Sequence, residues 1–184
     1  MYQLAATART PTGLVMGKSN ISPSWNRQIV RSVTRTSEVL NATWDEIDSA
    51  KRTWTIPARR MKVGVEHRVP LSDRVIEILD KAKTLRWKSL YVFPGREPTK
   101  ALSNMVFLMA LRRVERDDIT AHGFRSSFRD WAAERTNFAR AVCEAALAHT
   151  VRDKTEAAYN RTDLFDRRRE LMDAWSAFAT GATK

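Results

Sequence analysis

The chain has 184 residues, with 32 Lys and Arg side chains against 21 Asp and Glu, and a net charge of +11. Its length fits one domain, and 43% apolar with 29% charged residues is typical of a globular chain rather than a disordered one. The single cysteine, Cys143, excludes an intramolecular disulfide and indicates a reducing compartment. No apolar run reaches the ~20 residues of a membrane span. These features predict a basic cytoplasmic domain with a polyanionic partner, most often nucleic acid.

The positive charge is concentrated in one block of the chain. Residues 51–100 carry 13 basic and 5 acidic side chains, or +8, whereas residues 1–50, 101–150 and 151–184 carry +1 each. Apolar residues alternate through the basic block, so it is not an unstructured tail. We expect several of its side chains to line one face and neutralise phosphates, which would make binding salt-dependent.

The first 70 residues predict a flexible start followed by a small sheet. Residues 1–24 contain Pro, Gly, Thr and Ser without a sustained period, which indicates a flexible leader. Residues 24–40 carry a narrow apolar stripe that weakly favours a helix. Three runs with strand-like alternation follow at 43–48, 53–57 and 65–70, separated by polar turns. Short strands in sequence predict a small antiparallel sheet.

Beyond residue 72 the apolar period becomes helical. Apolar side chains recur at helical spacing over 75–82, 102–109, 124–132, 139–147 and 164–178. The fold class predicted from these elements is α+β: a mainly helical domain with a small three-stranded antiparallel sheet.

Some short segments concentrate residue types that suit phosphate chemistry. Taken singly, each also has an ordinary structural interpretation, such as a surface ion pair, a solvated lysine, a histidine at a helix end or a packed tyrosine. Their order and spacing along the chain are more specific than any one of them. The segments are 35–38, the turn around Lys62, 122–125, and 147–150 with Tyr159 ten residues after His149.

Taken together and in this order, the segments resemble the tyrosine recombinase family, most closely the catalytic domain of phage and prophage integrases. The resemblance runs from about Arg27 to the C-terminus. It implies site-specific integration or excision of a prophage or mobile element. In this family a tyrosine hydroxyl attacks a phosphodiester, which gives a 3′-phosphotyrosyl intermediate and a free 5′-hydroxyl without any metal or cofactor.

The resemblance also implies a role for each site residue. Two guanidiniums would clamp the non-bridging phosphate oxygens with their fork geometry. A histidine three residues before the second arginine, on the same helical face, would help to deprotonate the nucleophile or hold a phosphate oxygen. A lysine at a hairpin tip would protonate the leaving oxygen, a second histidine would donate to the phosphate, and a tyrosine would be the nucleophile. The two arginines are Arg35 and Arg125, and the histidine before the second arginine is His122. The lysine is Lys62, the second histidine is His149 and the nucleophile is Tyr159.

The chain departs from the family pattern near its start. Where the family usually has Thr-Gly-x-Arg, this chain has Ser32-Val33-Thr34-Arg35, and valine in place of glycine matters if that position needs a positive φ. Residues 1–24 do not resemble the family, and we expect its N-terminal DNA-binding modules to be absent. We therefore interpret 25–184 as a truncated catalytic domain behind a non-family leader, able to cleave a strand rather than complete recombination.

The sequence is also compatible with two other functions. One is a catalytically silent remnant that binds DNA or docks on other subunits, and the other is a general nucleic-acid-binding module. Expected partners are double-stranded DNA and other recombinase protomers, with exchange of the C-terminal helix at 164–179 as one way of docking. The chain's three histidines lack the spacing of a metal site, so no metal is expected.

Overall fold

The computed structural model describes residues 32–84, 88–113, 115–116, 118–149 and 163–181. The predicted leader at 1–24 and Tyr159 therefore lie outside the described residues. The predicted α+β fold is confirmed: the described part is mainly helical with one small three-stranded antiparallel sheet. In chain order its elements are α2 (Thr36–Leu40), η1 (Trp44–Glu46), β1 (Ile47–Asp48), β2 (Thr53–Ile56), η2 (Ala58–Arg60), β3 (His67–Pro70), α3 (Asp73–Thr84), α4 (Met105–Arg113), α5 (Ala121–Arg135), α6 (Arg140–Ala146) and α8 (Phe165–Thr180).

The sheet has the strand order β1–β2–β3, and both neighbouring pairs are antiparallel. In the central strand, Trp54 pairs with Ile47 on one side and Val69 on the other. Trp54 and Ile56 are completely buried, because alternation along a strand places both on the face that meets the core. The second and third predicted strands are thus confirmed, with the third beginning at His67.

The first predicted strand, at 43–48, is wrong over its first part. Trp44–Glu46 forms the 3₁₀ turn η1, and only Ile47–Asp48 belongs to the sheet. The reason is the buried Glu46, whose carboxylate accepts hydrogen bonds from Trp54 Nε1 at 3.0 Å and from Arg60. A buried carboxylate needs such partners, and the free energy of these hydrogen bonds outweighs the strand preference of the neighbouring residues.

The helix predicted over 24–40 is also wrong in its middle. Residues 24–31 lie outside the described part, residues 33–35 are not helical, and α2 comprises only five residues, Thr36–Leu40. Val33 has a φ of +58°, which is incompatible with a continuous right-handed helix. The position where the family usually has glycine therefore does require a left-handed backbone here.

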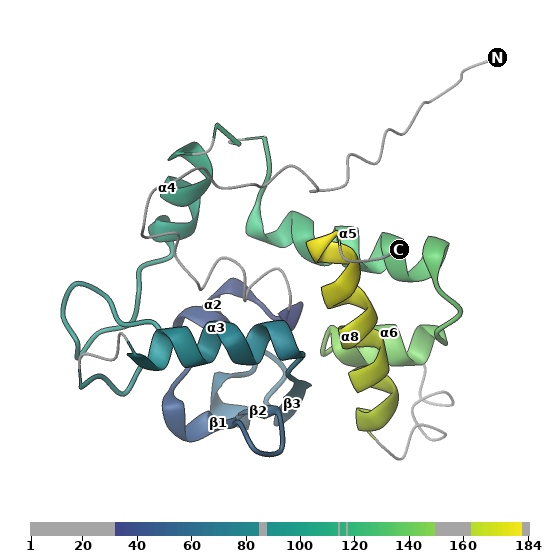
Figure 1. The fold of residues 1–184 in the computed structure, drawn as a ribbon, viewed down its shortest axis with the longest axis horizontal. Helices are drawn as coiled ribbons and strands as arrows, with labels where there is room; N and C mark the ends of the chain where they lie inside the picture. The colour runs from purple at the N-terminus through teal and green to yellow at the C-terminus, as the bar shows by residue number, and fades with distance from the viewer. Residues whose placement is uncertain (1–31, 85–87, 114, 117, 150–162, 182–184) are drawn as a thin grey trace.

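The first of two core clusters lies between the sheet, α2, α3 and α4. It includes Leu40, Trp54, Leu79 and Phe107, all buried. The predicted helix from residue 72 onward is confirmed as α3, whose buried side chains recur at helical spacing. In Figure 1 this part occupies one side of the molecule, with α4 at its edge.

The second cluster joins α5, α6 and α8, which gather on the other side in Figure 1. Its centre is aromatic: the ring centroids of Phe128 and Trp131 lie 5.4 and 5.2 Å from that of Trp175. Cys143 is buried in this cluster as a free thiol. Helix α8 thus packs on helices of its own chain, and none of the helices in the described part is long and apolar enough to cross a membrane.

Candidate active site

Arg35 stands at the N-terminus of α2, where Glu38 holds it from two sides. The Glu38 carboxylate accepts a hydrogen bond from the Arg35 backbone N–H at 2.7 Å and another from Arg35 Nη1 at 2.9 Å. Glu38 is buried, whereas the Arg35 side chain keeps 27% of its surface exposed. The arrangement fixes the base of the guanidinium and leaves the group partly open.

Arg125 lies in α5, the helix that Thr120 caps by accepting a hydrogen bond from the Gly123 N–H at 3.1 Å. Its guanidinium is buried and donates to two backbone carbonyls, those of Val33 and Leu147, the latter at 2.7 Å. Within the described residues, none of the carboxylates is hydrogen-bonded to Arg125. The carbonyls orient this cation without neutralising it.

Both arginines lie at the boundary between the two core clusters. Arg35 follows Val33 of the aromatic cluster and precedes Val39 of the sheet cluster. Along α5, Arg125 stands between Phe124 and Phe128, which belong to the sheet cluster and the aromatic cluster respectively. The packing of the two clusters against each other therefore determines how far apart the guanidiniums lie.

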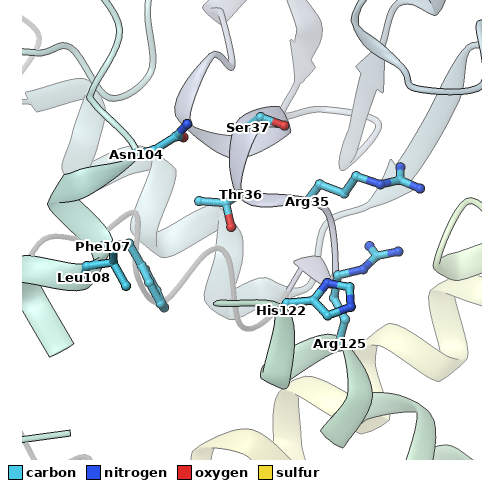
Figure 2. A pocket seen from close by; sticks show the side chains of 8 residues that line it. All are labelled: Arg35, Thr36, Ser37, Asn104, Phe107, Leu108, His122 and Arg125. Atoms are coloured by element: carbon cyan, nitrogen blue, oxygen red, sulfur yellow. The ribbon is translucent and has the colours of Figure 1, made fainter. Parts of the chain in front are cut away.

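Arg35, His122 and Arg125 line one pocket with a volume of about 410 Å³. Figure 2 shows the two guanidiniums extending in the same direction, with the His122 ring beside the stem of Arg125. The opposite side of the pocket is formed by residues at and just before α4, including the apolar Phe107 and Leu108. The prediction that His122 and Arg125 share one face of their helix is confirmed.

The electrostatics of the pocket favour an anion. Burial, together with the nearby positive charge of Arg35, lowers the pKa of Arg125 to about 10, and Glu38 offsets part of this effect. Two cations held close together in a half-buried pocket repel each other, and a bound phosphate would remove that cost. The fork geometry of both groups suits the oxygens of a phosphodiester.

His149 adjoins the same site from the end of α6. Its Nε2 lies 3.4 Å from Arg125 Nη2, and its Nδ1 lies 2.6 Å from Glu144 Oε2. Four of the six residues predicted from the sequence are therefore brought together, namely Arg35, His122, Arg125 and His149.

The other two predicted residues are not part of this group in the described structure. Lys62 is exposed in the turn between β2 and β3 and makes no hydrogen bond or ion pair with any described residue. Just before it, Arg60 is anchored, since its guanidinium donates to the Glu46 carboxylate and to the Glu38 carbonyl. This network ties the base of the Lys62 turn to the helix that begins beside Arg35. Tyr159 lies outside the described residues.

Three residues around the site were given no role in it from the sequence, although Arg60 and His67 lie in the Lys62 segment that contributes to the resemblance. Glu144 and Arg60 support it through the contacts given above, and buried His67 lies where β3 meets α6. Burial lowers the pKa of His67 to about 4, and the charges of Arg168, Arg125 and Arg35 act in the same direction. For Glu144, a usable signal is an acidic residue five positions before a histidine at a helix end. The carbonyls of Val33 and Leu147 have no sequence signature.

The basic block at 51–100 is less positive in space than in sequence, because three of its ion pairs use carboxylates from outside the block, namely Asp48, Glu46 and Asp163. Several of its side chains form ion pairs with carboxylates, which reduces the charge they offer to a partner. That this block lies along a polyanion stays a prediction. The pairs are Lys51–Asp48, Arg52–Asp73, Arg60–Glu46, Arg68–Asp163, Arg74–Glu77 and Lys100–Glu97.

This fold, with two arginines and two histidines gathered at the junction of a small sheet and a helical cluster, is consistent with the α+β catalytic domain that the sequence resembles. The model of the phage integrase family matches residues 27–164, and the chain belongs to that family. It is 37% identical over 153 residues to the prophage integrase IntA of Escherichia coli K12, which covers 82% of this chain. It is also 33% identical over 161 residues to the integrase of Enterobacteria phage P4, which covers 78% of this chain.

The chain spans about 37% of the length of each of these two relatives. A third relative, the prophage integrase IntZ of Escherichia coli K12, is 32% identical over 151 residues and matches in the same proportion of its length. The family membership thus rests on agreement over the segment that carries the predicted site.

Proposed function

We propose that this chain cleaves and rejoins DNA strands for site-specific recombination, with Tyr159 as the nucleophile. The observation that carries the proposal is the pocket in which Arg35 and Arg125 converge with His122, because Arg125 is buried there with carbonyl partners and no hydrogen-bonded carboxylate among the described residues. Such a cationic site suits the transition state of phosphoryl transfer, in which charge spreads over the non-bridging oxygens.

In the proposed reaction the hydroxyl oxygen of Tyr159 bonds to phosphorus while the bond from phosphorus to the 5′-oxygen breaks. His122 helps to take up the phenol proton or holds a phosphate oxygen, and Lys62 supplies a proton to the leaving oxygen. Arg35, Arg125 and His149 hold the phosphate. Rejoining is the reverse attack by a 5′-hydroxyl, so the energy of the phosphodiester is retained in the 3′-phosphotyrosyl link.

The partners proposed for this function are double-stranded DNA and further recombinase protomers. Exchange of the helix at 164–179 between protomers remains a prediction, since α8 is packed here against its own chain. Leu171 and Trp175 are completely buried by that packing. An exchange would have to rebuild the same contacts on a neighbouring copy.

The test is covalent capture of DNA. The purified chain is incubated with a pool of duplexes of randomised sequence beside a single-strand nick, so that cleavage releases a short fragment and traps the adduct. We expect a protein–DNA adduct stable to detergent and heat that disappears in Tyr159→Phe. We expect Arg125→Lys to reduce adduct formation by roughly 10²–10³-fold, since Lys cannot reproduce the bidentate contacts.

Arg74→Lys is the matched control, because Arg74 is a partly exposed residue of α3 that lies outside the pocket and is paired with Glu77. Its adduct level should equal that of the wild type. An adduct that persists in Tyr159→Phe would overturn the assignment of the nucleophile. A folded wild-type chain that binds duplex DNA without any adduct would overturn the enzymatic function and leave the silent DNA-binding alternative.

A further inference from the structure

Glu144 is a half-buried carboxylate that connects two elements of the site. Its Oε2 lies 2.6 Å from His149 Nδ1, and its Oε1 lies 3.7 Å from Arg129 Nε on α5. The Glu144 side chain is 20% exposed, compared with 39% for His149 and 59% for Arg129. Nothing in the reaction described above uses this carboxylate.

The backbone holds Glu144 and His149 together as firmly as the side chains do. Helix α6 ends in a Schellman motif, in which the His149 N–H donates to the Glu144 carbonyl at 3.0 Å and the Ala148 N–H donates to the Ala145 carbonyl at 3.1 Å. Ala148 has the left-handed φ of +49° that this motif requires. His149 is therefore bound to Glu144 through both its backbone N–H and its imidazole ring.

The contact between Glu144 and His149 determines where the ring carries a proton. An ionised carboxylate only accepts hydrogen bonds, so the proton in the 2.6 Å contact is on Nδ1 of His149. The other nitrogen, Nε2, then carries no proton and accepts a hydrogen bond from Arg125 Nη2 at 3.4 Å. To donate to a phosphate oxygen from there, the ring must carry protons on both nitrogens.

An imidazolium at this position would be a third cation beside Arg125 and Arg35. Glu38 partly offsets Arg35, and buried His67 adds no positive charge near neutral pH because its pKa is about 4. Glu144 supplies the negative charge that compensates the imidazolium directly, and Arg129 orients the far oxygen of that carboxylate.

We propose that Glu144 is a positioning residue for strand cleavage: it holds the Nδ1 proton of His149, so that Nε2 donates to a phosphate oxygen beside Arg125. The proposal rests on the function proposed above. In this proposal Glu144 does not contact DNA. It sets the tautomer and orientation of His149 and balances the charge of that ring.

Two variants separate the charge of Glu144 from its hydrogen bond. Glu144→Gln keeps an acceptor of similar size and loses the charge, whereas Glu144→Ala loses both. We expect both to lower the single-turnover rate of adduct formation on the nicked duplex pool, by on the order of 10²-fold, because His149 would then be neutral and would lose the charge-assisted hydrogen bond to the phosphate. DNA affinity should be unchanged. Glu170→Gln is the matched control, since Glu170 is an exposed residue that pairs with Arg167.

A second measurement does not depend on activity. Long-range ¹H–¹⁵N NMR spectra of the folded chain distinguish the protonated nitrogens of its three histidines, which are assigned by single His→Gln variants. In the wild type we expect a proton on Nδ1 of His149, and in Glu144→Ala we expect a neutral ring with its proton on Nε2. A merely structural role for Glu144 would lower folding stability without this change of tautomer.

Either of two results would overturn the proposal: a His149 signal that is the same in wild type and Glu144→Ala, or adduct formation by Glu144→Gln at the rate of Glu170→Gln. If the wild type forms no adduct at all, the proposed function fails. The NMR result then still decides whether Glu144 holds the Nδ1 proton.

Discussion

Val33 links backbone strain to the position of a site residue. It is a buried, β-branched residue with a φ of +58°, and its carbonyl accepts a hydrogen bond from Arg125. A non-glycine residue in this conformation costs about 1–3 kcal/mol, which the surrounding packing must overcome. The strain therefore lies at the one residue that both turns the chain before Arg35 and orients Arg125.

A comparison of two substitutions isolates this strain. Glycine adopts a positive φ at no steric cost, whereas alanine does not, so Val33→Gly is expected to be more stable than Val33→Ala by about 0.5–1 kcal/mol. Both variants lose the same buried side chain beyond Cβ, which leaves the backbone as the main difference. Urea unfolding followed by circular dichroism measures the two free energies of unfolding.

The control pair is at Val39, a buried residue inside α2. There the usual helical order applies, and Val39→Gly should be less stable than Val39→Ala by about 1 kcal/mol. Finding the same order at both positions would contradict the left-handed assignment of Val33.

At the scale of elements, what could be predicted depended on whether side-chain pattern alone decides the structure. The alternation around Trp54 and the helical spacing from Val75 to Ala82 correctly gave β2 and α3, because both follow from burial of one face. The 3₁₀ turn at Trp44–Glu46 was missed because a distant partner, Arg60, determines it. The hydrogen bonds from Arg125 to the carbonyls of Val33 and Leu147 could not be predicted either, since every residue has a carbonyl and the sequence does not mark which ones are used.

The end of α6 shows how an element positions a side chain. Its Schellman motif places His149 back over Glu144, but the left-handed position is occupied by Ala148 rather than glycine. Ala148→Gly should therefore raise the free energy of unfolding by about 0.5–1 kcal/mol, since it removes only a methyl group and relieves the backbone. Thermal and urea unfolding of the variant provide the measurement.

Ala145→Gly, within the same helix, is the control, because residue 145 has an ordinary right-handed helical backbone. Glycine in a helix interior costs about 0.5–1 kcal/mol relative to alanine, so this variant should be less stable than the wild type. If both substitutions destabilise the chain equally, the motif does not require a left-handed residue at 148.

For the molecule as a whole, the site depends on how the two core clusters are held together. Arg168 of α8 is almost completely buried and donates to the Arg68 carbonyl of β3 at 2.6 Å and to the Asp163 carbonyl at 2.7 Å. His67, also on β3, lies near Arg168 and Arg125 and hydrogen-bonds to the backbone of Ala146 in α6. The sheet and the helical cluster thus meet over a buried imidazole surrounded by guanidiniums.

This junction predicts that the whole fold loses stability in mild acid. His67 has a pKa of about 4 when folded against 6.5 for an ordinary histidine, because burial and the neighbouring arginines disfavour its charged form. Between these values the unfolded chain binds a proton that the folded chain does not. The contribution of neutral His67 to the free energy of unfolding is therefore fully present above pH 6.5 and is lost as the pH falls from 6.5 to 4. The loss from this residue amounts to at most about 3 kcal/mol.

The measurement is urea unfolding at several pH values from 4 to 8, for the wild type, His67→Gln and His122→Gln. The His67→Gln variant should be less stable near neutral pH, but its stability should fall less between pH 6.5 and 4, because the proton uptake on unfolding is gone. His122→Gln is the control, since it removes a histidine that is exposed in the pocket rather than one buried at the junction of the two clusters. Should all three curves run parallel, His67 is not the group that couples acid to the junction of the two clusters.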